Sequence, residues 1–109
     1  DEPRRYDWEV GTLIVPPNMW FHQHFNSGTT PARYLAFKHE VVSIRNAQGV
    51  PKAWISRRVG GDQIDYADEI PVVRKMFTEE LAKHGLTPRM DQAYAQELAD
   101  LPPPMAKSA

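Results

Sequence analysis

The chain has no cysteine among its 109 residues, so it can form no disulfide and offers no thiolate for catalysis or zinc binding. Neither sign of charge dominates, because 13 Lys and Arg stand against 14 Asp and Glu, a net charge of -1. This balance predicts no surface for nucleic acid or an anionic membrane. No apolar run approaches the roughly 18 residues of a transmembrane helix, and no basic-then-apolar stretch resembles a signal peptide. We therefore expect a cytoplasmic protein without nucleic-acid or membrane partners.

Two sequence patterns divide the chain into residues 1–67 and 68–109. The first part consists of short extended runs between turn signals, which is typical of an antiparallel sheet or barrel. The clearest predicted strands cover residues 12–15, which a double proline closes, 20–26 and 32–39. Weaker strand candidates cover residues 41–44, 53–56 and 63–66.

Residues 68–109 are expected to form a helical extension. Asp68 or its acidic neighbour can cap a helix whose first turn holds Pro71, where the missing N–H costs no hydrogen bond. Gly85 is placed to end this helix, and a second helix is expected from about residue 87 to about residue 99. The apolar stripe of the first helix consists of Val72, Val73, Met76, Phe77 and Leu81. The sequence thus predicts a mainly β chain with C-terminal α-helices.

Residues 20–26, which we call the histidine segment, carry the strongest functional signal. Alternate residues of a strand share a face, so His22 and His24 point the same way, together with Trp20 and Asn26. Aromatic residues such as Phe25 occupy the other face. Two imidazoles on one side of an apolar run need a metal ion, a buried hydrogen bond or water. The alternative to a metal site is a pair of satisfied polar side chains in a sheet, or a pair that faces solvent.

The spacing of this region matches a known motif. It reads Gly11, five residues, Pro17, four residues, His22, three residues, Asn26. This pattern resembles the second conserved motif of the cupin superfamily, although Met19 stands where that motif has a glycine. The flanks DWEVGTLIVPP and PARYLAF are similar to strands of a small cupin barrel, and GGDQIDYADEIPVVRKMFTEELAKHG is similar to the helical extension of some bacterial cupins. The resemblance implies a cupin-type antiparallel β-barrel or jelly-roll portion, the C-terminal part of a cupin-domain protein or of a bicupin.

The resemblance also implies a metal centre. His22 matches the metal ligand of the motif, and His24, on the same face, is the second candidate. Imidazole suits Fe, Mn, Ni, Cu or Zn, and an oxygen-activating site favours Fe. The ligands of the first cupin motif are absent, so we expect the rest of the site from another chain or from an N-terminal part of the protein. The aromatic residues Phe21 and Phe25 also call for a covering layer, which predicts an oligomer or a larger assembly.

Two classes of function stay open. The first is a metal-dependent enzyme, best described as a non-haem iron dioxygenase that acts on a small aromatic or carboxylate substrate. Trp20 and Tyr34 are candidates to contact an aromatic ring and Arg33 to hold a carboxylate, although such residues are more often core and solvated surface. The second class is a non-catalytic cupin module, either a small-ligand binder or the structural half of a two-domain or two-chain cupin. His39 and His84 are interpreted as structural.

Overall fold

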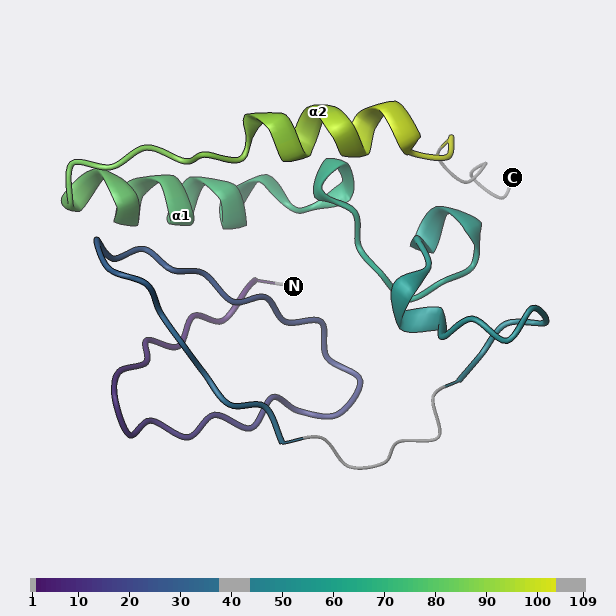
Figure 1. Ribbon diagram of the computed structural model, residues 1–109, viewed down its shortest axis with the longest axis horizontal. Helices are drawn as coiled ribbons and strands as arrows, with labels where there is room; N and C mark the ends of the chain where they lie inside the picture. Colours follow the sequence, from purple (N-terminus) through teal and green to yellow (C-terminus); the bar gives the residue numbers. More distant parts are fainter. Residues whose placement is uncertain (1, 38–43, 104–109) are drawn as a thin grey trace.

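The computed structural model describes residues 2–37 and 44–103 of the chain. Within them lie two α-helices, α1 (Pro71–Lys83) and α2 (Asp91–Asp100). Three short 3-10 helices precede them: η1 (Lys52–Trp54), η2 (Arg57–Val59) and η3 (Tyr66–Asp68). The chain runs away from η3 through α1, turns, and returns so that α2 packs on η3 (Figure 1). A second helix is present, as the sequence predicted, but it begins at Asp91 rather than at about residue 87.

The predicted mainly β architecture is wrong for this structure. No β-strand, sheet or barrel is present in the described ranges, which are helix and coil. Two isolated bridges are present, an antiparallel one between Arg45 and Pro51 and a parallel one between Ser56 and Gln63. The cupin-type barrel predicted for residues 1–67 is therefore not observed, and two weaker strand candidates are replaced in part by η1 and η3.

The three clearest predicted strands fail for a common physical reason. Residues 12–15, 20–26 and 32–37 run back and forth below α1 as irregular segments (Figure 1). A strand is defined by hydrogen bonds to a neighbouring strand, and alternation along one segment does not say which segment that is. Between residues 12 and 37 the backbone hydrogen bonds of the described chain are turn contacts. His39 and the candidate strand 41–44, apart from Ile44, lie outside the described residues.

The boundaries of α1 follow local signals. Pro71 occupies its first turn, and the N-cap is Ile70 rather than the acidic residue that the sequence suggested. At the other end Gly85 adopts a φ of 67°, the left-handed conformation that glycine tolerates best. The N–H of Leu86 then donates to the carbonyl of Leu81 at 3.0 Å, as in a Schellman motif. The prediction of a helix from Pro71 that Gly85 ends is confirmed.

A small core joins α1 to the histidine segment. Leu81 is 6% exposed, and among the described residues it is the one apolar side chain that is buried. Phe77, one turn earlier, is half-buried, and its ring centroid lies 4.8 Å from that of Phe25. Val72, at the start of the helix, is 41% exposed. The apolar stripe of α1 is therefore buried mainly in its second half, where it meets the histidine segment.

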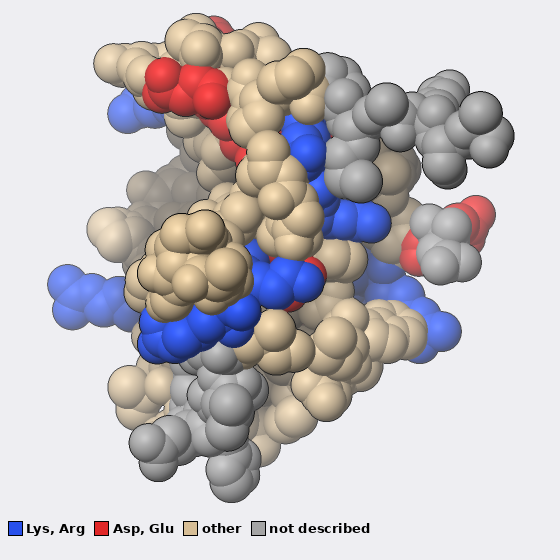
Figure 2. All heavy atoms as spheres, turned by 90° about the vertical axis from the view of Figure 1, so that its right-hand side faces the viewer, with Lys and Arg blue, Asp and Glu red and all other residues tan. Residues whose placement is uncertain are grey.

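Polar contacts hold the C-terminal part together. The carboxylate of Glu97 on α2 accepts the backbone N–H of Tyr66 at 3.0 Å and that of the next residue at 3.1 Å. Arg58 donates to both carboxylate oxygens of Asp68, at 2.6 and 2.7 Å, and to the carbonyl of Pro102 at 2.9 Å. Figure 2 views the molecule from the right-hand side of Figure 1 and shows Lys and Arg side chains across the middle of that face. Arg58 is paired with Asp68, and Lys52 lies 3.8 Å from Asp62, so the charge of these two cations is partly neutralised.

The chain is open for its size. Its accessible surface is 9949 Å², whereas a compact monomer of this mass exposes about 6,200 Å². Its radius of gyration is 16.2 Å, compared with about 13 Å for a compact domain of this length. The most exposed large apolar side chains in residues 2–37 are Val10, Leu13, Val15, Met19, Leu35 and Phe37. Neither helix in the described part of the chain has the length and apolar composition that crossing a bilayer requires.

Candidate metal centre

A turn directs the histidine segment away from the preceding prolines. The N–H of Trp20 donates to the carbonyl of Pro17 at 3.2 Å, which closes a four-residue turn. Met19, the third residue of that turn, has a φ of 65°. A positive φ at this position is typical of a type II turn, where glycine is preferred. The residue that replaces the motif glycine therefore adopts the backbone conformation that glycine would favour.

One contact favours Nε2 as the nitrogen of His22 that is available to an ion. Its Nδ1 lies 3.3 Å from the carbonyl oxygen of Trp20. A carbonyl oxygen can only accept, so the neutral ring makes a hydrogen bond here in the tautomer that carries the proton on Nδ1. The lone pair then resides on Nε2, as in metal-binding histidines that donate their other N–H to a backbone carbonyl. His22 is exposed, so Nε2 is accessible to an ion.

His22 and His24, which we call the histidine pair, are close enough to share an ion. Their ring centroids are 5.5 Å apart, with the planes 79° apart. A metal–nitrogen bond of about 2.1 Å places two imidazole centroids roughly 5 Å apart around one tetrahedral ion. In residues 2–37 and 44–103 no group of three or more His, Asp or Glu side chains is arranged to hold a metal ion. The described chain therefore provides two candidate ligands, and a complete site needs others.

One aromatic ring lies against His24, and a second ring supports the first. The ring of Tyr34 stacks on it with centroids 4.7 Å apart and planes 26° apart. Trp8 in turn meets Tyr34 edge to face, at a centroid distance of 6.3 Å. We call Trp8, Tyr34 and His24 the aromatic stack. Tyr34 was predicted as a site residue and does lie beside the pair, whereas Trp8 was missed because it precedes the motif and only the folded chain brings it there.

The other predicted substrate residues lie elsewhere. The ring of Trp20 lies under the guanidinium of Arg4, 5.3 Å from its carbon, so Trp20 contributes its carbonyl rather than its ring to the His22 contact. Arg33 is exposed on the segment that follows, and none of the contacts described here brings it to the histidine pair. A carboxylate-binding role for Arg33 stays a prediction.

The opposite face of the histidine segment packs against different elements. Phe25 contacts Phe77 of α1, and the guanidinium carbon of Arg57 lies 5.3 Å from the ring centre of Phe21. The alternation of two faces that the sequence predicted is therefore reflected in the contacts. Asn26 closes the following turn: its side chain donates to the carbonyl of Thr30 at 2.9 Å and accepts the N–H of the residue two positions on at 3.0 Å.

One ion pair attaches the segment that precedes Trp8 to α1. The guanidinium of Arg5 lies 2.8 Å from the carboxylate of Glu80 and 2.7 Å from that of Asp7. Lys83 also pairs with Glu80. The two cations, Arg5 first, lower the pKa of the Glu80 carboxyl to about 2. Trp8 thus follows a segment that is anchored electrostatically to the helix.

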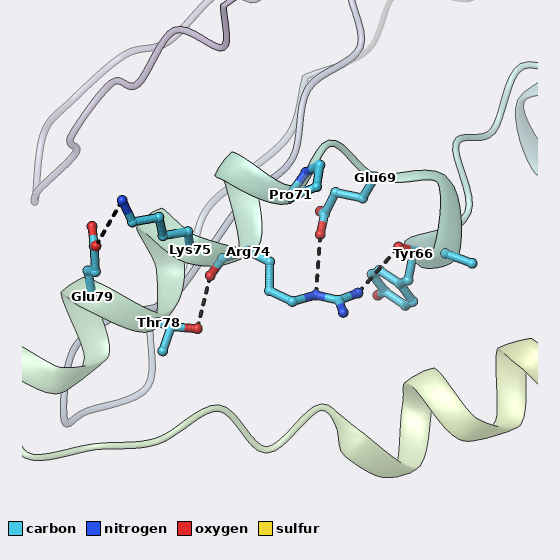
Figure 3. A pocket seen from close by; sticks show the side chains of 8 residues that line it. Tyr66, Glu69, Pro71, Arg74, Lys75, Thr78 and Glu79 are labelled. Atoms are coloured by element: carbon cyan, nitrogen blue, oxygen red, sulfur yellow. Dashed lines mark hydrogen bonds and ion pairs between the residues drawn. The ribbon is translucent and has the colours of Figure 1, made fainter.

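A separate cavity of about 630 Å³ lies between η3 and the first half of α1. Its charged groups point mainly at one another (Figure 3). Arg74 donates to the carbonyl of Tyr66 at 3.3 Å, lies 4.0 Å from Glu69 and stacks 4.0 Å from the ring centre of Tyr94. Because its main cation is already paired with groups of the chain, this cavity is a weaker candidate for ligand binding than the histidine pair.

Comparisons of the chain with protein-family models, with curated proteins and with solved structures find no match. The cupin resemblance therefore rests on the motif residues themselves.

Proposed function

We propose that the histidine pair supplies two ligands of a transition-metal centre in a metal-dependent oxidoreductase. The observation that carries the proposal is the 5.5 Å separation of the two rings, together with the Nδ1 contact that leaves Nε2 of His22 free. Two imidazoles suit Fe, Mn, Ni, Cu or Zn, and Fe is the ion that the resemblance to cupins favours. When bound with open positions, such an ion supplies Lewis-acid or oxygen-activating chemistry.

The proposed reaction class is that of a non-haem iron dioxygenase acting on a small aromatic or carboxylate compound. Tyr34, beside His24, is the candidate for contact with an aromatic ring. The proposal includes a cytoplasmic location, since a chain without cysteine has no need of an oxidising compartment.

The remaining ligands are proposed to come from polypeptide outside the described residues. The chain exposes about 3,700 Å² more surface than a compact monomer of its mass, and obligate interfaces bury roughly 2,000–5,000 Å² counted over both partners, about half of it on each. Residues 10–32 contain no Asp, Glu, Lys or Arg, although a quarter of the chain is charged. An uncharged, apolar surface of this kind favours a partner with an equally uncharged face. We propose that this partner covers the histidine segment and brings at least one carboxylate or imidazole.

A non-catalytic module is the second candidate. It is favoured by one observation, that the described residues contain no group of three or more His, Asp or Glu side chains that could hold a metal ion. Such a module would bind a small ligand, or would hold a partner chain without turning over a substrate. Oxygen consumption by the iron-loaded complete assembly, measured with a panel of small aromatic acids, separates the two. Turnover with any of them supports the enzyme, and its absence from a fully metallated assembly supports the module.

Titration calorimetry with Ni²⁺ tests the metal site itself, because Ni²⁺ binds imidazole and does not change oxidation state during the measurement. The comparison uses the protein, the variants His22→Ala and His24→Ala, and His84→Ala as the matched control. His84 is also exposed but lies at the end of α1. We expect at least tenfold weaker binding for His22→Ala, a smaller or equal loss for His24→Ala and no change for the control. Equal affinity in the His22→Ala variant would refute the assignment.

A further inference from the structure

His24 is exposed, yet the ring of Tyr34 stacks on one face of its imidazole. An exposed histidine on an irregular segment samples several staggered χ1 positions and a broad range of χ2. Here Tyr34 covers one face of the imidazole at 4.7 Å and 26°, and Trp8 supports Tyr34 from the side. The same ring orientation places His24 5.5 Å from His22, near the separation that two imidazoles have around one ion. In a single conformation, therefore, the His24 ring both stacks on Tyr34 and lies at a distance from His22 that allows the two rings to share an ion.

We propose that Tyr34 is a positioning residue, which presets the His24 ring so that a metal ion is bound by the histidine pair rather than by His22 alone. The inference rests on the proposed metal site and adds a residue outside the ligand set. Trp8 supports Tyr34 in this role. Tyr34 does not contact the ion; it acts through the ring of His24.

The size of the effect follows from the cost of immobilising a side chain. Fixing one rotamer-rich side chain on binding changes affinity by about twofold to about tenfold. When the stack is removed, the ion must order the His24 ring itself, so Ni²⁺ binding is expected to weaken by that factor. The ring of Tyr34, not its hydroxyl, makes the contact, so phenylalanine should retain most of the effect.

A double-mutant cycle on Ni²⁺ affinity, followed by calorimetry, tests the proposal. The variants are Tyr34→Leu, Tyr34→Phe, His24→Ala and the double variant His24→Ala/Tyr34→Leu. Tyr6→Leu is the matched control, because Tyr6 is 66% exposed and Tyr34 62% exposed. We expect Tyr34→Leu to weaken binding by about twofold to about tenfold. We expect Tyr34→Phe and Tyr6→Leu to bind like the unaltered protein, and Tyr34→Leu to have no effect once His24 is alanine.

The cycle separates positioning from a general effect on folding. A folding defect would weaken binding equally with and without His24, and that result would overturn the proposal. Unchanged or tighter Ni²⁺ binding in Tyr34→Leu would also overturn it and leave the metal site intact. If the unaltered protein bound no Ni²⁺, the proposed function itself would fail. The ¹H resonances of the His24 ring give a second measurement: loss of the Tyr34 ring current should shift them, while those of His84, at the end of α1, stay in place.

Discussion

Replacing Leu81 by alanine tests whether the small core described above stabilises the chain. Leu81 is 6% exposed, and complete burial of a leucine side chain contributes about 1.5–3 kcal/mol. Leu→Ala changes in cores cost about 2–5 kcal/mol, and the higher values belong to sites that keep a cavity. Leu81 already borders an open cavity of about 480 Å³ that Phe77 and Leu86 also line. Its neighbours can move into the space, so we expect a loss of about 2 kcal/mol.

Urea unfolding followed by circular dichroism at 222 nm measures this loss, because α1 supplies much of the helical signal. Leu98→Ala is the control, since Leu98 lies on α2 and is 62% exposed. Its effect should stay within about 0.5 kcal/mol, the usual range for surface changes. If Leu81→Ala and Leu98→Ala unfolded at the same urea concentration, the region around Leu81 would not be a core and the packing described here would be wrong.

Three further predictions concern single residues. The variant Met19→Gly should be more stable than Met19→Ala by about 1 kcal/mol in urea unfolding, because φ is positive at this position. Equal stability of the two variants would contradict the left-handed conformation of residue 19. Glu97→Ala should cost about 1 kcal/mol by the same assay, because two N–H groups at η3 lose their acceptor; an unchanged midpoint would contradict this. The pKa of Glu80 is lowered to about 2 from 4.5, so its ion pairs should stabilise the fold above pH 4.5 and lose that contribution as the pH falls toward 2. Glu80→Gln should therefore be less stable than the unaltered protein at neutral pH and match it near pH 2, whereas a difference that persists at low pH would refute the sign.

The sequence predicts α1 well because its signals act over a single turn. Pro71 fixes the start and Gly85 the end, and neither depends on the rest of the chain. The strands fail because they depend on partners. The β-branched run of residues 12–15 and the two-faced pattern of residues 20–26 are present in the sequence, but the described residues contain no neighbour that pairs with them.

The candidate site also has a part that the sequence predicts and a part that depends on the fold. The spacing of His22 and His24 along one segment is a local property, so the sequence alone names the pair as candidates. Tyr34 contacts His24 across the turn that Asn26 closes, whereas Trp8 reaches Tyr34 through the fold of the whole N-terminal region. The sequence contains one hint of the positive φ of Met19, because this residue stands where the motif has a glycine. Only the backbone conformation shows what that hint indicates.

The central claim is that the histidine pair binds a transition-metal ion in an assembly larger than this chain. Native mass spectrometry of the purified protein, combined with elemental analysis, tests both parts in one measurement. The predicted result is a species heavier than the single 12.5 kDa chain that carries a transition metal, and that loses the metal in the His22→Ala variant. A metal-free species with the mass of one chain, unchanged when Fe²⁺ or Ni²⁺ is added, would contradict the account.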